Sequence, residues 1–153
     1  MILSTKGRYA VMAMVDLAAS QEDAKPVSLA AIAERQEIPQ AYLEQIFARL
    51  KKAGLVQAVR GPGGGYRLAQ GAGNTRISDI MQAADESIKM TRCSGSDDPA
   101  GCMAPKTRCL THDLWEGLGN HIFMYLYNIT LADVCNREVD IFPAPVQKQA
   151  AAN

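Results

Sequence analysis

Residues 28–70 read SLAAIAERQEIPQAYLEQIFARLKKAGLVQAVRGPGGGYRLAQ, and this stretch decides the fold. In its first part, apolar residues recur at helical spacing, and Ser28 is placed to cap a short helix over LAAIAERQ. Ile38 and Pro39 end the following turn, and Pro39 is expected at the first position of the next helix. The apolar face of that helix consists of Tyr42, Leu43, Ile46, Phe47 and Leu50.

The periodicity changes after Gly54, a candidate C-cap of this second helix. LVQAVR (55–60) and YRLAQ (66–70) are predicted to be strands, joined by a turn at the glycine-rich segment 61–65. A helix-turn-helix followed by a two-stranded hairpin is typical of the winged helix-turn-helix, a mainly α fold. The helix at about 40–53 would then be the recognition helix that enters the major groove of DNA.

Helices are also predicted on both sides of this motif. Before it, Thr5 is expected to cap a helix that ends near Ser20. After it, ISDIMQAADES (77–87) is expected to form a helix capped by Ser78 or Thr75. The predicted apolar stripe of the first helix is broad and consists of Tyr9, Met12, Val15 and Leu17, with Ala residues between them.

A long apolar helix is predicted from about Leu110 to Asn128, roughly 30 Å in length at 1.5 Å per residue. Its stripe consists of Leu110, Leu114, Leu118, Ile122, Leu126 and Ile129, widened by Trp115, Phe123 and Tyr125. A helix this apolar needs a partner, and we prefer a second copy of the chain, which makes it a dimerisation helix. Packing on its own domain is the alternative. Thr130 is expected to cap a last short helix.

The chain therefore divides into four predicted parts. Residues 1–76 form a winged helix-turn-helix DNA-binding domain, and 77–109 form a linking helix and a cysteine-bearing loop. Residues 110–140 form the dimerisation helix and a short C-terminal helix, and 141–153 form a disordered tail.

The charge distribution favours a polyanionic partner. The net charge is zero, but residues 1–76 contain 10 Lys and Arg against 6 Asp and Glu, a net +4. No acidic residue lies between Glu44 and Asp79, whereas six basic residues do: Arg49, Lys51, Lys52, Arg60, Arg67 and Arg76. Such a stretch is either a nucleic-acid footprint or an ordinary solvated face. No apolar run approaches the ~20 residues of a membrane span, and no secretory signal is recognisable, so a cytoplasmic protein is expected.

The recognition helix would present its N-terminal residues to base edges, namely Gln40, Ala41, Tyr42, Glu44 and Gln45. Gln45 can pair with adenine, and Glu44 can accept a hydrogen bond from cytosine while disfavouring sites that offer no donor. For Glu44, an ordinary exposed helix charge is the alternative. The residues expected on phosphates are Arg49, Lys51 and Lys52.

The hairpin offers a second contact, because Arg60 at its edge can enter a narrow minor groove. The glycines at 61–65 would let the backbone approach the duplex, or they simply form a turn. A nucleotide-binding loop is excluded, because no Gly-Lys-Ser/Thr follows and the next element is a strand.

Cys93, Cys102, Cys109 and His112 form a candidate metal site, with spacings of eight, six and two residues between them. Three thiolates and an imidazole suit tetrahedral zinc and the terminal positions of a 2Fe–2S cluster equally well. A nucleophilic Cys109–His112 pair lacks a third orienting residue, so no enzyme activity is expected. Cys135 is expected to be a buried thiol.

Several segments together resemble the iron–sulfur cluster regulators among the Rrf-type winged-helix transcriptional regulators. They are STKGRYAVMAMVDLA, YLEQIFARLKKAGLV, VRGPGGGYRL, CLTHDLW and NITLADV. The resemblance implies a homodimeric DNA-binding repressor with a 2Fe–2S cluster on Cys93, Cys102, Cys109 and His112, which makes 77–109 the cluster-binding region. It also implies base reading by Ala41, Tyr42, Glu44 and Gln45 and a wing contact by Arg60.

The resemblance further implies control of cluster-assembly genes, with a cluster-assembly scaffold protein as the cluster donor. Two features depart from the family pattern: the loops between the cysteines are longer than usual, and Ala41 stands where a hydroxyl residue is common. The alternative function is a zinc-stabilised winged-helix DNA-binding protein without redox sensing.

Overall fold

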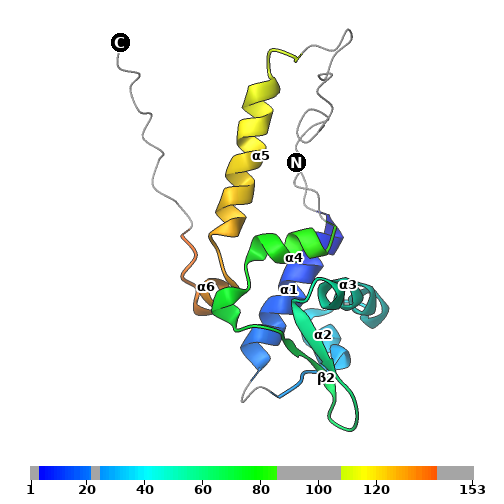
Figure 1. Ribbon diagram of the computed structural model, residues 1–153. Coiled ribbons are helices and arrows are strands. Elements are labelled where there is room, and N and C mark those ends of the chain that lie inside the picture. The colour runs from blue at the N-terminus through cyan, green and yellow to red at the C-terminus, as the bar shows by residue number, and fades with distance from the viewer. Residues whose placement is uncertain (1–3, 22–24, 86–107, 141–153) are drawn as a thin grey trace.

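The computed structural model describes residues 4–21, 25–85 and 108–140, so the predicted tail at 141–153 lies outside the described residues. The elements in chain order are α1 (Thr5–Ser20), α2 (Leu29–Gln36), α3 (Gln40–Lys52), β1 (Val56–Val59), β2 (Gly65–Leu68), the 3₁₀ turn η2 (Ala72–Asn74), α4 (Ile77–Ala83), α5 (His112–Tyr127) and α6 (Leu131–Asn136). Figure 1 shows the helices gathered around α1, with the hairpin below them and α5 projecting above. The predicted fold class, mainly α with a winged helix-turn-helix, is confirmed.

The centre of the core is α1, which contacts α2, α3, α4 and α6. Its fully buried face includes two small residues, Ala10 and Ala13, beside Met14 and Leu17. Of the predicted stripe, Leu17 is fully buried, and Tyr9, Met12 and Val15 are partly buried and pack against the core. Alanines on this face let several helices approach closely.

The start of α1 also differs from the prediction. Ser4, not Thr5, is the N-cap residue, and its hydroxyl accepts a hydrogen bond of 3.2 Å from the Gly7 N–H. Both residues are of a type that caps helices well, so composition alone does not choose between them.

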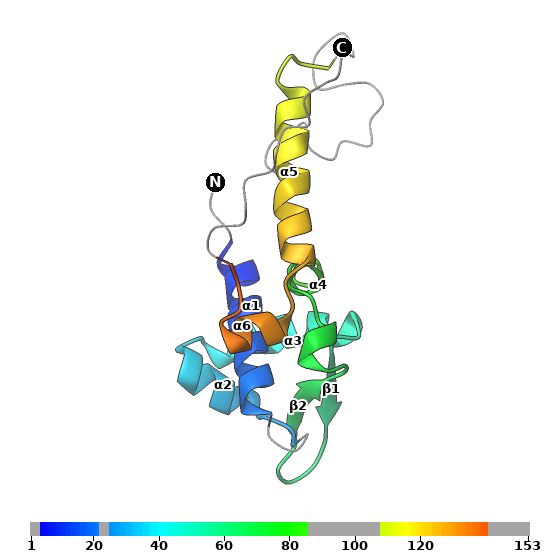
Figure 2. The same ribbon diagram turned by 90° about the vertical axis from the view of Figure 1, so that its left-hand side faces the viewer.

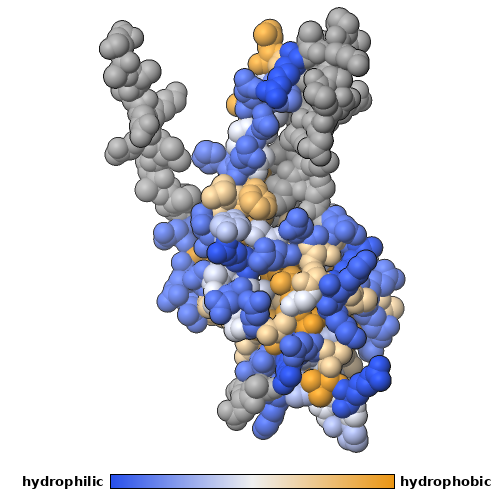
Figure 3. Space-filling model, viewed as in Figure 1, coloured by the Kyte–Doolittle hydropathy of each residue, from blue (hydrophilic) through white to orange (hydrophobic). Residues whose placement is uncertain are grey.

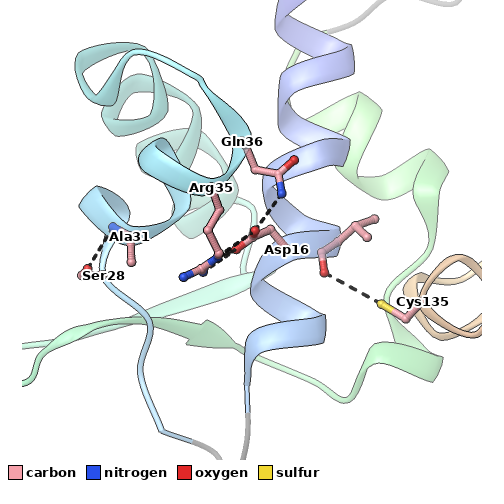
Figure 4. A network of polar contacts seen from close by, with 7 residues as sticks. Asp16, Ser28, Ala31, Arg35, Gln36 and Cys135 are labelled. Atoms are coloured by element: carbon pink, nitrogen blue, oxygen red, sulfur yellow. Dashed lines mark hydrogen bonds and ion pairs between the residues drawn. The ribbon is translucent and has the colours of Figure 1, made fainter.

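A buried carboxylate joins α1 to α2. Asp16 is 7% exposed, and it accepts hydrogen bonds from Arg35 Nη2 at 2.6 Å and Gln36 Nε2 at 2.7 Å (Figure 4). Arg35 Nε also donates to both carboxylate oxygens. The hydrogen bond to Asp16 raises the pKa of the Arg35 guanidinium. Burying a carboxylate is costly unless it is paired, so these contacts fix the position of α2 against α1.

The turn between α2 and α3 differs slightly from the prediction. Ser28 caps α2 as expected, accepting from the Ala31 N–H at 3.2 Å. The turn begins at Glu37, which has a left-handed backbone with φ of 53°. Pro39 then occupies the N-cap of α3 instead of its first helical position.

The end of α3 forms a Schellman motif. Ala53 is the C-cap, and Gly54 follows with φ of 75°, a conformation that favours glycine. The Gly54 N–H donates to the Lys51 carbonyl and the Leu55 N–H donates to the Leu50 carbonyl, both at 3.0 Å. The helix therefore stops where the sequence indicates, with Gly54 one position beyond the cap.

The wing is the antiparallel pair β1–β2, with Val56 opposite Leu68 and Val59 opposite Gly65. Both strands are shorter than predicted, because Leu55 and Ala69 form only the closing hydrogen bond of 3.0 Å. On the outer side of β2, Val27 and Tyr66 exchange two backbone hydrogen bonds of 2.8 Å. The Tyr66 ring also packs edge-on against Phe47 of α3, with centroids 4.8 Å apart.

Two of the wing glycines are required by the chain itself. A Cβ on Gly65 would lie 2.3 Å from the Val27 carbonyl oxygen, and a Cβ on Gly64 would lie 2.4 Å from the Val59 carbonyl oxygen. These glycines permit the close passage of neighbouring backbone, which is a reason independent of any approach to DNA.

The predicted caps of α4 are wrong. Arg76 is the N-cap and provides no side-chain hydrogen bond, while Ser78 lies buried inside the helix. The Thr75 hydroxyl donates to the Gly71 carbonyl at 3.4 Å instead. The start of α4 is held by backbone pairing: the Ile77 N–H donates to the Ile129 carbonyl at 2.9 Å.

The C-terminal elements return to this same point. The Leu131 N–H donates to the Thr75 carbonyl at 2.9 Å, and Leu131 is fully buried in the core. Thr130 caps α6 as predicted, in a capping box with Asp133. The Thr130 backbone N–H and hydroxyl donate to the Asp133 carboxylate and lower its pKa. Ile129 and Leu131, which follow α5, thus attach the C-terminal end of this helix (its base) to Thr75 and Ile77 of the winged part.

Beyond that base, α5 stands clear of the other described helices in both views (Figures 1 and 2). It begins at His112, two residues later than predicted. The exposed large apolar residues of this region are Leu110, Leu114, Phe123, Met124, Tyr125 and Tyr127. Figure 3 shows an orange group at its free end, and further orange groups lie among the blue side chains of the winged part. No helix within the described residues is long and apolar enough to cross a membrane.

The role of the wing glycines can be tested by substitution. We expect Gly65→Ala to lower the free energy of unfolding by about 1–3 kcal/mol, because the added Cβ must displace the Val27 backbone. Gly71→Ala is the matched control, with nothing within 4 Å of the added Cβ, and should change stability by less than about 0.5 kcal/mol. Urea unfolding measures both, and equal stabilities for the two variants would contradict this account of the wing.

Candidate functional site

The surface of α3 divides into a buried face and an exposed face. Leu43, Ile46, Phe47 and Leu50 point into the core. Of the residues predicted to face DNA bases, Gln40, Ala41, Glu44 and Gln45 are exposed. Tyr42 is half-buried, and its ring meets Tyr9 of α1 edge-on at 5.7 Å.

The Glu44 carboxylate has a partner on its own helix. Gln40 Nε2 donates to Glu44 Oε1 at 3.2 Å, one turn apart on the exposed surface. This weak contact leaves the carboxylate accessible, since an exposed side-chain pair of this spacing contributes only a few tenths of a kcal/mol.

The cations predicted to contact phosphates lie in two environments. Lys51 and Lys52 are exposed in the last turn of α3, at the negative end of its dipole. Arg49 forms an ion pair with Asp85, just after α4. Arg49 and Lys52 also line an open groove of about 780 Å³ between α3 and the α4 region, together with Asp79 and Asp85.

The wing adds two further basic side chains. Arg60 is exposed where the chain leaves β1. Arg67 is exposed on β2, and its Nε and Nη2 donate to Gln57 Oε1 at 3.1 and 3.0 Å across the hairpin. The sequence shows Arg67 only as part of the basic stretch. The contact with Gln57 depends on the strand register, which places the two residues opposite each other and is not evident from the sequence.

The predicted cluster ligands are described in part. Cys93 and Cys102 lie outside the described residues, whereas Cys109 and His112 are placed one turn apart at the start of α5. The Cys109 carbonyl accepts from the His112 N–H at 3.0 Å, and Cys109 Sγ is 3.6 Å from Thr111 Oγ1. His112 is 7% exposed, which is unusual for a side chain beside an otherwise exposed turn.

Two carboxylates near His112 were missed by the sequence analysis. His112 Nε2 is 3.6 Å from Glu116 Oε2, at i,i+4 spacing on α5. One ligand atom each from His112, Asp113 and Glu116 lies within 4.8 Å of the others. The i,i+4 spacing of His112 and Glu116 was the available signal, because such residues share a helix face.

Cys135 is separate from this group. It lies half-buried on α6, and its Sγ donates to the Val15 carbonyl at 3.8 Å (Figure 4). Burial raises the pKa of the Cys135 thiol, which makes it a poor ligand and nucleophile. The 16 residues of α5, roughly 24 Å of helix, separate the His112 end from the end that leads to α6.

A helix-turn-helix with an exposed polar recognition helix and a basic, glycine-rich wing defines a winged-helix DNA-binding transcriptional regulator. The comparison with protein families agrees: residues 3–137 match the Rrf2 family model, described as an iron-dependent transcriptional regulator. The chain belongs to the Rrf2 family. Its relatives are named transcriptional regulators. The chain is therefore a regulator, and the prediction that it is not an enzyme is confirmed.

Similar proteins include two curated regulators. The HTH-type transcriptional regulator IscR of Cereibacter sphaeroides is 46% identical over 145 residues, covering 94% of this chain and 93% of the relative. The IscR of Citrobacter koseri is 49% identical over 138 residues, covering 90% of this chain and 82% of the relative.

Solved structures give the same result. T. potens IscR aligns with a TM-score of 0.70 at 38% identity, covering 90% of this chain and 88% of that chain. CymR, the global cysteine regulator of B. subtilis, aligns with a TM-score of 0.72 at 29% identity, covering 90% of this chain and 98% of that chain.

The wing contact is tested by Arg60→Ala. If Arg60 neutralises DNA charge, this variant should weaken duplex binding and reduce the slope of log affinity against log salt by about 0.9. Fluorescence anisotropy over a salt series measures both quantities. Arg137→Asn is the control, because it removes one charge after α6, on the opposite side of α1 from α3 (Figure 1). Equal slopes for wild type and Arg60→Ala would exclude the contact.

Proposed function

We propose that this chain is a cytoplasmic, homodimeric repressor that reads iron–sulfur status through a 2Fe–2S cluster held by Cys93, Cys102, Cys109 and His112. The observation that carries the proposal is the placement of Cys109 one turn before the buried His112 at the start of α5, in a chain similar to proteins named IscR. The cluster would be a centre that responds to redox conditions and to the supply of iron–sulfur clusters, in the chain between the winged part and α5.

The donor chemistry fits such a group. Three soft thiolates and one imidazole match the four terminal positions of a 2Fe–2S core. Zinc uses the same donors, so a zinc-stabilised protein without redox sensing remains the second candidate. Similarity to IscR proteins favours iron–sulfur over zinc.

Glu116 would act on the site through His112. A carboxylate beside a ligating imidazole fixes the orientation and tautomer of the ring. Its Oε2 lies 3.6 Å from His112 Nε2, close enough to influence the orientation of the ring.

Dimerisation would use the exposed apolar face of α5. Leu114 and Tyr125, eleven residues apart and therefore on one side of the helix, stay on the surface of a single chain although they are large and apolar. Two copies packed along α5 would bury them and would place two α3 helices on one DNA duplex. Winged-helix dimers of this kind read half-sites about 34 Å apart, one helical turn.

Control would follow if the dimer with the cluster (loaded) and the dimer without it (unloaded) differ in their affinity for DNA. A ligand shifts an equilibrium only by binding two states with different affinity. In the proposed mechanism the loaded dimer binds the operators of cluster-assembly genes, including its own, and a scaffold protein supplies the cluster. The unloaded dimer retains a second class of sites. Glu44 is the residue that accepts a different set of DNA bases in the loaded form and in the unloaded form.

Ligation is tested by anaerobic purification with iron, sulfide and zinc analysis. We expect the wild type to contain iron and sulfide and to absorb in the visible range, whereas Cys109→Ala should lose both. Cys135→Ala is the matched control, because this thiol lies on α6 and contacts the Val15 carbonyl, away from Cys109 and His112, and the variant should keep its iron and sulfide. Colourless wild-type protein containing stoichiometric zinc would support the second candidate instead.

The role of Glu44 is tested by selecting binding sites from random DNA with unloaded protein. Unloaded wild type should enrich a restricted set of sites, and unloaded Glu44→Ala should enrich a broader set, because the repelling carboxylate is gone. Glu138→Ala is the control, because it removes an exposed carboxylate after α6, outside the base-reading set, and should keep the restriction. Identical site sets for wild type and Glu44→Ala would assign base discrimination to other residues.

A further inference from the structure

Two cations from different helices converge on a single carboxylate oxygen. Lys6 Nζ of α1 lies 3.6 Å from Asp85 Oδ2, and Arg49 Nη1 of α3 forms an ion pair with the same oxygen. Two positive groups arranged around one oxygen form an anion site, and here the anion is a side chain of the protein.

The position of this site beside the recognition helix is significant. Lys6 and Arg49 line a small hollow together with Tyr42, Gln45 and Ile46. Gln45 is an exposed residue of the proposed base-reading set, so both cations border the surface that a DNA duplex would approach. Lys6 brings the start of α1 into this site, although the sequence alone did not connect that helix with DNA.

The carboxylate that fills the site is easily displaced. The Asp85 side chain is 71% exposed and that of Arg49 is 43% exposed, so water competes for both groups. Asp85 also has a left-handed backbone with φ of 55°, a conformation that aspartate tolerates better than most residues. Exposed ion pairs contribute little to stability, so breaking this one costs the fold little.

We propose that Lys6 and Arg49 form a binding site for a DNA phosphodiester, and that Asp85 occupies this site until a phosphate displaces it. The DNA backbone offers the same ligand chemistry, an anionic oxygen, with the added attraction of the neighbouring phosphates. Asp85 therefore acts as a competing internal anion that lowers DNA affinity. This inference rests on the proposed function, because it requires a duplex on the α3 face.

The test compares Asp85→Asn with Asp79→Asn. Both variants remove one negative charge from the same groove, but only Asp85 contacts the two cations among the described ion pairs. We expect Asp85→Asn to bind a duplex of random sequence about two- to fivefold more tightly than Asp79→Asn, the range that a surface ion pair provides. Anisotropy titrations with the full chain at one fixed salt concentration measure the difference, and thermal melting confirms that both variants are folded.

A double-mutant cycle identifies the cause. In a Lys6→Ala/Arg49→Ala background, DNA binding should be weaker, and the extra gain from Asp85→Asn should disappear. Equal gains from Asp85→Asn and Asp79→Asn, or a gain that persists without the two cations, would overturn the inference. Absence of duplex binding by the wild type would instead contradict the proposed DNA-reading surface, so the two failures are distinguishable.

Discussion

Close packing against the small-residue face of α1 is the constraint on which the rest of the structure depends. Ala10 and Ala13 are completely buried there, and α2, α3, α4 and α6 all contact this one helix. A larger side chain at either alanine would have to move a neighbouring helix, because protein cores contain little free volume. The position of the recognition helix is therefore set by α1 and not by the helix-turn-helix alone.

The same helix connects the parts that would have to communicate. Near its C-terminal end, Asp16 holds α2 through Arg35 and Gln36, while near its N-terminal end Lys6 meets Asp85 beside α3. The Thr75–Leu131 backbone hydrogen bond and the capping box at Thr130 fix the base of α5 close to α4. The C-terminal end of α5 is therefore connected with α1 and α3 through packed helices, the kind of contiguous contact that coupling between distant sites can use.

Sequence patterns predicted the winged motif well, because helical periodicity, Gly54 and the glycine-rich hairpin are local signals. They failed where the answer depends on tertiary packing. Thr5 was expected to cap α1 where Ser4 does so, and Ser78 was taken for a cap although it lies inside α4. The pairing of Arg49 with Asp85 joins residues far apart in sequence, which no local pattern indicates. Of the predicted cluster ligands, Cys109 and His112 lie one turn apart, and the ligation itself stays a prediction.

The most direct test of the central claim compares the DNA affinity of loaded and unloaded protein. Full-length wild type, purified anaerobically, would be titrated with a duplex selected by the loaded form, before and after removal of iron and sulfide. The account predicts that loading tightens binding by about five- to 150-fold, the usual range of allosteric coupling. Equal affinities for the two forms, with the dimer intact in both, would contradict it.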